Sequence, residues 1–237
     1  MIDSVWHVVD FDSTIHRAQY SADMGDPYCT LIKLSDDSFL VYSPGRGLAD
    51  SAKELLPENP QLILLAPATG HTLGLEEWKN AFLRTTVIAS NEARVRIREK
   101  TSITTLQDAG SVSASLPEHV KIHVVPSNKL GEIWVSLTTD EAGGTIYWAV
   151  CDSVMNLSEL GVGLVTKIFF KFYGLGIGIR IHKIFSRGVK DKSEFLQWAS
   201  QRFPNDKRNV LLPCHGAVYD APDLSERVTE LINSNFS

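Results

Sequence analysis

Three side chains that can bind a metal ion each follow a short apolar run of the sequence. They are His71 after residues 62–65, Asp152 after residues 145–150, and His215 after residues 210–212. Such runs are typical of buried strands, and the loops at the carboxyl ends of strands in one sheet meet at a common edge. Two imidazoles and a carboxylate are a workable ligand set for zinc or iron. The three residues together predict a metal site, although each alone is more simply explained as a hydrogen-bonded loop residue.

The clearest local structure is residues 62–78, which we expect to hold His71 at the edge of a site. A buried run, Leu62–Leu65, leads through small residues and Gly70 into an amphipathic segment that begins at Leu75. This pattern predicts a strand that enters a helix through a short loop, where α/β proteins often build their sites.

The remaining pattern predicts strands in hairpins first, then strands with helices, then hairpins again. We expect strands over residues 6–11, 28–34, 38–43, 62–65, 85–89, 121–125, 132–137, 145–150 and 209–213, and helices over 48–56, 75–83, 192–202 and 223–232. Residues 93–100 are predicted as an arginine-rich helix or loop. This order favours a mixed α/β class, with two mixed sheets packed face to face and helices outside, in a single domain over residues 1–237.

The composition of the chain bears on its cellular compartment and on the kinds of partner that it can bind. A net charge of −5 gives no basic stripe, so we expect no nucleic-acid partner. The N-terminal residues show no signal peptide, and the three widely spaced cysteines indicate free thiols in a reducing compartment; we therefore predict a cytoplasmic protein. Nucleophilic catalysis by Cys151 or Cys214 beside His215 is a minor alternative, because buried free thiols are usually inert.

An apolar segment at about residues 157–185 is predicted as a helical insert, broken near Gly174–Gly178, that covers the cleft. Charged or titratable residues interrupt it, among them Lys167, Lys171, Arg180, His182 and Lys183, so no uninterrupted apolar run is long enough for a membrane span. Its aromatic cluster is a candidate for weak contact with a membrane surface or for holding an apolar small-molecule ligand: Phe169, Phe170, Phe172 and Tyr173.

The order of elements resembles the metallo-β-lactamase superfamily, whose fold is a four-layer αββα sandwich. Five stretches carry the resemblance: Phe39–Gly45 (an aspartate-x-glycine strand end), Leu64–Leu75 (the HxHxDH loop), Val124–Glu132 (the PGHTxG loop), Ala149–Asp152 (the strand ending in the bridging aspartate) and Leu211–Gly216 (the PGHG loop). The resemblance implies a hydrolase-like fold with metal ions at these loops.

The sequence departs from the family pattern at most metal ligands. Ser43 stands where the family has the aspartate of its first strand end, and His71 stands where the HxHxDH loop has its aspartate. The positions of the remaining imidazoles carry residues that bind metals poorly: Pro67, Thr69, Thr72 and Asn128. The resemblance therefore implies that no dinuclear site forms. Asp152 and His215 remain as matched ligands, with His71 as a substituted neighbour.

A divergent branch of the superfamily, a bacterial domain family of unknown function, is the nearer resemblance. It rests on Pro67–Trp78, Asp152–Asn156, Leu157–Phe185 and His215-Gly216. We expect a degenerate member that is most simply a non-catalytic protein binding a small molecule or a partner. The alternative is a mononuclear metal-dependent hydrolase of an ester, lactone or phosphoester, in which one zinc or iron ion is held by His71, Asp152 and His215. Glu132 or Asp10 is then a candidate general base, and nothing in the sequence chooses between them.

Overall fold

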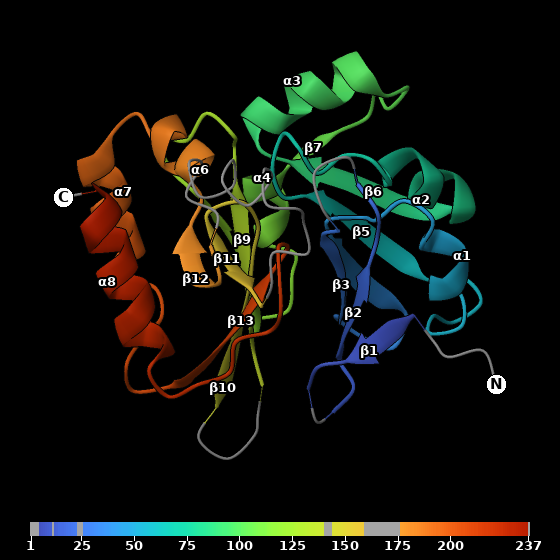
Figure 1. Cartoon of the computed structure of the whole chain (residues 1–237). Helices are drawn as coiled ribbons and strands as arrows, with labels where there is room; N and C mark the ends of the chain where they lie inside the picture. The colour runs from blue at the N-terminus through green and yellow to red at the C-terminus, as the bar shows by residue number, and fades with distance from the viewer. Residues whose placement is uncertain (1–4, 11, 23–25, 140–143, 159–175, 237) are drawn as a thin grey trace, which may run out of the picture. The chain divides into compact units, whose positions relative to one another are not determined.

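A computed structural model describes residues 5–10, 12–22, 26–139, 144–158 and 176–236 of the chain (Figure 1). It contains two compact units, Met1–Glu118 and His119–Ser237, and each unit has its own sheet and its own hydrophobic core. The prediction of a single domain over the whole chain stays a prediction.

Unit 1 is built on a seven-stranded mixed sheet, coloured blue to green in Figure 1. Its strands lie side by side in chain order: β1 (Trp6–Val8), β2 (Ile15–Gln19), β3 (Tyr28–Lys33), β4 (Ser38–Tyr42), β5 (Gln61–Ala66), β6 (Arg84–Ala89) and β7 (Gln107–Asp108). The pairs from β1 to β4 are antiparallel, and those from β4 to β7 are parallel. The helices are α1 (Ala49–Ala52), α2 (Leu75–Ala81), α3 (Asn91–Lys100) and α4 (Ala109–Ser113).

The sequence predicted most of these strands but missed β2 and the two-residue β7. The segment Ile15–Gln19 contains His16 and Arg17, so it lacks the apolar alternation that identifies a strand. Arg17 is nevertheless buried, and its guanidinium lies 4.1 Å from the centre of the Tyr28 ring on β3. This cation–π contact offsets part of the cost of burying the charge. The contact could not be predicted from any periodicity in the sequence.

Helix α2 fixes the loops at the carboxyl ends of β4 and β5. The indole Nε1 of the fully buried Trp78 donates to the carbonyl of Gly45 at 2.9 Å. Glu77 accepts hydrogen bonds from the backbone N–H groups of Gly47 and Ala49, at 2.7 and 3.0 Å. The loop that carries His71 and the loop after β4 are therefore held against one helix.

Unit 2 combines a four-stranded sheet, in the order β13-β10-β9-β8, with a separate two-stranded pair, β11-β12. The strands are β8 (Val120–Val124), β9 (Ile133–Thr138), β10 (Thr145–Val150), β11 (Val154–Leu157), β12 (Gly178–Ile181) and β13 (Arg208–Pro213). The pair β9-β10 is antiparallel, as the predicted hairpin requires; β8-β9 is antiparallel too, and β10-β13 is parallel. Helices α6 (Lys183–Gly188), α7 (Lys192–Ala199) and α8 (Leu224–Phe236) complete the unit, whose core is rich in aromatic rings. Both sheets are thus mixed, as predicted.

The predicted helical insert is wrong where its ends are described. Val154–Leu157 and Gly178–Ile181 pair as antiparallel strands, and helix α6 begins only at Lys183. The prediction failed because β11 and β12 are four residues each, too short to show an alternating pattern. The predicted aromatic cluster, residues 169–173, lies outside the described residues. Within the described ranges, no helix has both the length and the apolar character to cross a membrane.

The close approach at Gly74 gives a stability prediction. A Cβ at this position would lie 2.4 Å from the carbonyl oxygen of Pro44, whereas a Cβ at Gly70 in the same loop would meet nothing within 4 Å. Gly74→Ala should therefore lower the free energy of unfolding by about 1–3 kcal/mol, because backbone must move to admit the methyl group. Urea unfolding measures the change, with Gly70→Ala as the matched control at near wild-type stability. Equal stability of the two variants would contradict the packing described for this loop.

Candidate functional site

Two of the three predicted metal ligands meet in unit 2. Strands β10 and β13 run parallel with Val150 opposite Pro213, so Asp152 and His215 both follow the same edge of the sheet. The Asp152 Oδ1 and His215 Nε2 atoms are 3.2 Å apart, and each side chain is about a quarter exposed, at 23%. Loops at the carboxyl ends of neighbouring parallel strands converge, and for this reason the sequence predicts the contact.

Backbone hydrogen bonds hold both loops. The N–H of Cys214 donates to the carbonyl of Val150 at 2.8 Å, and the N–H of Asn156 on β11 donates to the carbonyl of His215 at 3.0 Å. Gly216 has a φ of 106°, and a Cβ there would lie 1.9 Å from the carbonyl oxygen of Asn156. Only glycine fits this position, so the glycine of the late His-Gly motif is needed to bring the His215 loop against β11.

Glu132 is a buried clamp on the loop that carries Asp152. Its Oε1 accepts hydrogen bonds from Trp134 Nε1 (2.8 Å), from the backbone N–H of Cys151 (3.0 Å) and from Ser153 Oγ (2.5 Å). Complete burial and, to a smaller extent, the nearby charge of Asp152 raise the pKa of Glu132 to about 8, against the lowering effect of the three donors. Its Oε2 has no hydrogen-bond partner among the described residues. Glu132 is therefore protonated at neutral pH and holds the residues on both sides of Asp152.

Neither carboxyl group considered as a general base suits that role. A carboxyl that is already protonated at pH 7, as in Glu132, accepts no further proton. Asp10 belongs to unit 1, where it accepts hydrogen bonds from the backbone N–H groups of Thr14 (3.1 Å) and Ile15 (2.7 Å) and from the Thr14 hydroxyl. It closes the turn between β1 and β2.

His182 is a third titratable group beside the pair, and its only predicted role is to interrupt the apolar insert. Its backbone N–H donates to the carbonyl of Ser153 at 3.3 Å, next to Asp152. Burial lowers the pKa of His182; the charge of Asp152 raises it and that of His215 lowers it. Its Nδ1 accepts the N–H of Ile184 at 3.1 Å, so the neutral ring carries its proton on Nε2. His182 is thus a hydrogen-bond donor near Asp152 and His215 rather than a ligand.

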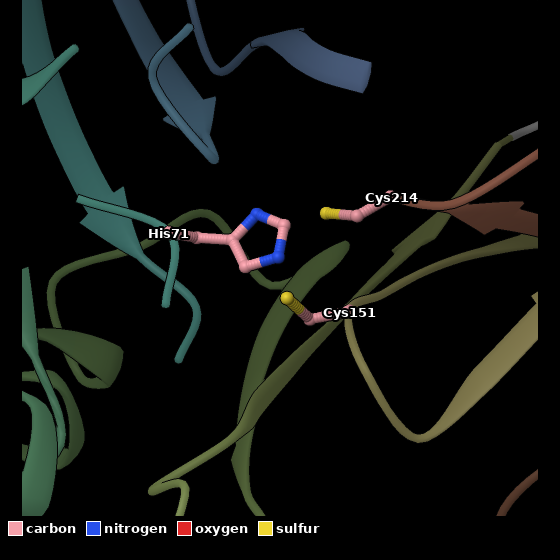
Figure 2. Close-up of side chains that lie close together, drawn as sticks. All are labelled: His71, Cys151 and Cys214. Carbon is pink, nitrogen blue, oxygen red and sulfur yellow. The ribbon is translucent and has the colours of Figure 1, made fainter. Parts of the chain in front are cut away.

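Cys151 and Cys214 directly precede Asp152 and His215, just after the neighbouring strands β10 and β13. Both are buried free thiols, and their sulfur atoms lie within 4.8 Å of each other (Figure 2, where the labelled His71 belongs to unit 1). Burial and the neighbouring Cys214 thiol raise the pKa of Cys151 well above its usual range. A protonated thiol is a poor nucleophile, so these observations disfavour the alternative of cysteine catalysis.

In unit 1, His71 follows β5 as predicted and sits in a polar cluster that the sequence did not suggest. His71 Nδ1 lies 2.9 Å from Ser43 Oγ and 3.4 Å from the hydroxyl of Tyr20. Ser43 Oγ and the Tyr20 hydroxyl are 2.9 Å apart, and all three residues are buried.

The residues that replace the family's imidazoles have structural roles where their contacts are described. Asn128 is buried, and its Oδ1 accepts the N–H of Leu130 at 2.7 Å to close a turn in unit 2. Thr72 is buried in the loop of unit 1 that leads to α2. An amide engaged in a turn is a poor replacement for a zinc-binding imidazole.

Comparisons with known proteins identify the fold. No family model matches the sequence, and no curated protein matches it. Solved structures do match: DIM-1 metallo-β-lactamase is 11% identical, with 97% of each chain covered and a TM-score of 0.59. A fragment of the putative diflavin flavoprotein A 5 from Nostoc sp. PCC 7120 is 9% identical over 97% of each chain, with a TM-score of 0.61. The flavodiiron protein from Giardia intestinalis is 12% identical over 94% of this chain and 56% of its own, with a TM-score of 0.61.

The chain therefore has the metallo-β-lactamase fold and is a divergent example of it. This confirms the predicted fold class, and the resemblance to the superfamily is confirmed at the level of the fold alone. Because no family model matches, the resemblance to the bacterial branch of unknown function stays a prediction.

The raised pKa of Glu132 gives a prediction about pH and stability. Its pKa is near 4.5 in an unfolded chain and about 8 when folded, so its contribution is fully present below pH 4.5 and is lost as pH rises to 8. The loss is about 1.4 kcal/mol per pH unit in that window. Glu132→Gln keeps an oxygen acceptor but does not titrate, so its free energy of unfolding should fall less steeply with pH than that of the wild type.

Urea unfolding of the wild type and of Glu132→Gln at several pH values between 5 and 8 measures the two slopes. At pH 5, Glu132→Ala should lower the stability by more than about 3 kcal/mol, because it leaves three donors without an acceptor and opens a cavity. This difference from the wild type should shrink as pH rises to 8, because only the wild type loses the contribution of Glu132. Identical pH slopes for the wild type and Glu132→Gln would show that Glu132 is ionised in the folded protein.

Proposed function

We propose that the protein is a metal-dependent hydrolase-like enzyme with at most one metal ion, held by Asp152, His215 and His71. The observation that carries this proposal is the contact of 3.2 Å between Asp152 Oδ1 and His215 Nε2 in unit 2. The family names of the neighbours, metallo-β-lactamase and flavodiiron protein, are consistent with a fold that houses metal chemistry.

The donor atoms of unit 2 suit a shared metal ion. Two ligand atoms, each about 2.0–2.1 Å from a tetrahedral zinc ion, are roughly 3.3 Å apart. The separation between Asp152 Oδ1 and His215 Nε2 is close to that value, and both side chains retain partial exposure, as a site that must admit a substrate requires. Oxygen and imidazole nitrogen donors suit zinc or iron.

His71 lies in unit 1, so the distance between Asp152 and His215 does not bear on it, and other contacts support it as the third ligand. It follows the carboxyl end of β5, and one of its ring nitrogens already faces hydroxyl groups. Ligating histidines usually bind the metal through one nitrogen and donate from the other, so this arrangement supports the assignment.

A divalent metal ion at such a site supplies acidified water and polarises an ester, lactone or phosphoester. The residues of the chain supply the rest. Glu132 keeps the Asp152 loop in place through the backbone of Cys151 and the hydroxyl of Ser153. His182, with its proton on Nε2, is a donor that can hydrogen-bond an oxygen of the substrate close to Asp152 and His215.

Metal analysis of purified variants tests the proposal. The wild type should bind up to one equivalent of zinc or iron, and His215→Ala and Asp152→Ala should each lose more than about tenfold in affinity together with any esterase, lactonase or phosphoesterase activity. Affinity should fall at acid pH, because a histidine must be neutral to bind a metal. Equilibrium dialysis with elemental analysis measures the metal, and His119→Ala, an exposed histidine of the same unit, is the control.

Two other results of the metal analysis would contradict this proposal. Protein that binds no metal and hydrolyses nothing would support the non-catalytic reading, in which the protein binds a small molecule or a partner. Two tightly held ions per chain would contradict the mononuclear site. The apolar ligand, the cytoplasmic location, the bacterial source and the weak membrane contact remain proposals from the sequence.

A further inference from the structure

Ser43 has a backbone conformation that serine rarely adopts. Its φ of 57° lies in the left-handed region, where the Cβ of an L-residue is strained and glycine or asparagine is favoured. The side chain is completely buried, and it lies at the end of β4, one strand over from the strand that precedes His71. Strained residues of this kind persist where the surrounding structure determines them, and they gather at functional sites.

The surrounding residues aim the hydroxyl of Ser43 at His71. The N–H of Ser43 donates to the carbonyl of Leu65 on β5 at 3.0 Å, which extends the parallel pairing by one residue before the chain turns. The turn then places Gly45, where a Cβ would lie 2.4 Å from Cδ1 of the Tyr20 ring. Glycine at position 45 therefore allows the Tyr20 ring to approach, and its hydroxyl completes the cluster with Ser43 and His71.

These contacts bear on where the proton of His71 lies. A neutral imidazole carries one proton, on Nδ1 or on Nε2, and the hydrogen bond at one nitrogen decides which. Ser43 Oγ can accept Nδ1–H of His71 at 2.9 Å and donate its own proton to the hydroxyl of Tyr20 at 2.9 Å, so this buried hydroxyl is used both as acceptor and as donor. In that arrangement the lone pair of His71 is on Nε2.

We propose that Ser43 is a positioning residue, kept in a strained conformation because its hydroxyl holds the proton of His71 on Nδ1 and leaves Nε2 to bind a metal ion. The role of Nε2 rests on the proposed function, whereas the position of the proton does not. Tyr20 assists by accepting the proton of Ser43, and its removal should have a smaller effect than removal of the serine hydroxyl.

Ser43→Gly is the sharpest variant, because it removes the hydroxyl and relieves the strained backbone at the same time. Ser43→Ala removes the hydroxyl and keeps the strain, so its thermal midpoint should be lower than that of Ser43→Gly. Ser13→Gly is the matched control: Ser13 has a φ of 54° in the same unit but an exposed side chain. Tyr20→Phe tests the outer part of the cluster.

Long-range proton–nitrogen NMR spectra of the metal-free protein report the tautomer, with the His71 signals assigned by their loss in His71→Gln. The wild type and Ser13→Gly should show His71 protonated on Nδ1, and Ser43→Gly should show a mixture or the Nε2 tautomer. Zinc affinity should fall by about tenfold or more in Ser43→Gly and stay within about twofold of the wild type in Ser13→Gly.

A wild-type His71 with its proton on Nε2, or a Ser43→Gly variant with an unchanged tautomer, would overturn the proposal. If the wild type binds no zinc, the proposed function fails, while the tautomer of metal-free His71 still tests the role of Ser43. If zinc binds normally but Ser43→Gly leaves its affinity unchanged, the proposed function stands and the positioning role is wrong.

Discussion

The register of the parallel pairing between β10 and β13 is the constraint on which the candidate site of unit 2 depends. Val150 lies opposite Pro213, so the residues that follow, Asp152 and His215, leave the sheet at one level. A slip of one residue would turn the side chains of β13 to the opposite face. Trp148 on β10 opposes this slip, because its Nε1 donates to Asn209 Oδ1 on β13 at 2.8 Å, inside the aromatic core.

Buried polar groups form the second layer of support in both units. In unit 2, Glu132 binds the residues on both sides of Asp152, and in unit 1, Ser43 and Tyr20 face one nitrogen of His71. Polar groups are costly to bury, and the cost is lowest when each is hydrogen-bonded. A protein selected only for stability would place apolar residues there, so these clusters are better explained by the side chains that they orient.

Much of the fold and part of the site could be predicted from the sequence. Continuous apolar runs marked β5, β10 and β13, and the polar residues after them were recognisable as candidate ligands. Strand β2 was hidden by the buried Arg17, and β11 and β12 were too short to distinguish from a helix. The roles of the residues that support the candidate ligands could not be predicted, for a different reason. The left-handed backbone of Ser43 and the tautomer of His182 depend on the local folded structure.

The central claim is that Asp152 and His215 are two ligands of one metal ion. Anomalous diffraction at the zinc absorption edge, from crystals grown with zinc, tests it most directly. One strong peak per chain, within bonding distance of Asp152 Oδ1 and His215 Nε2, is the predicted result. An unchanged hydrogen bond between the two side chains, with zinc absent from that position or bound only elsewhere, would contradict it.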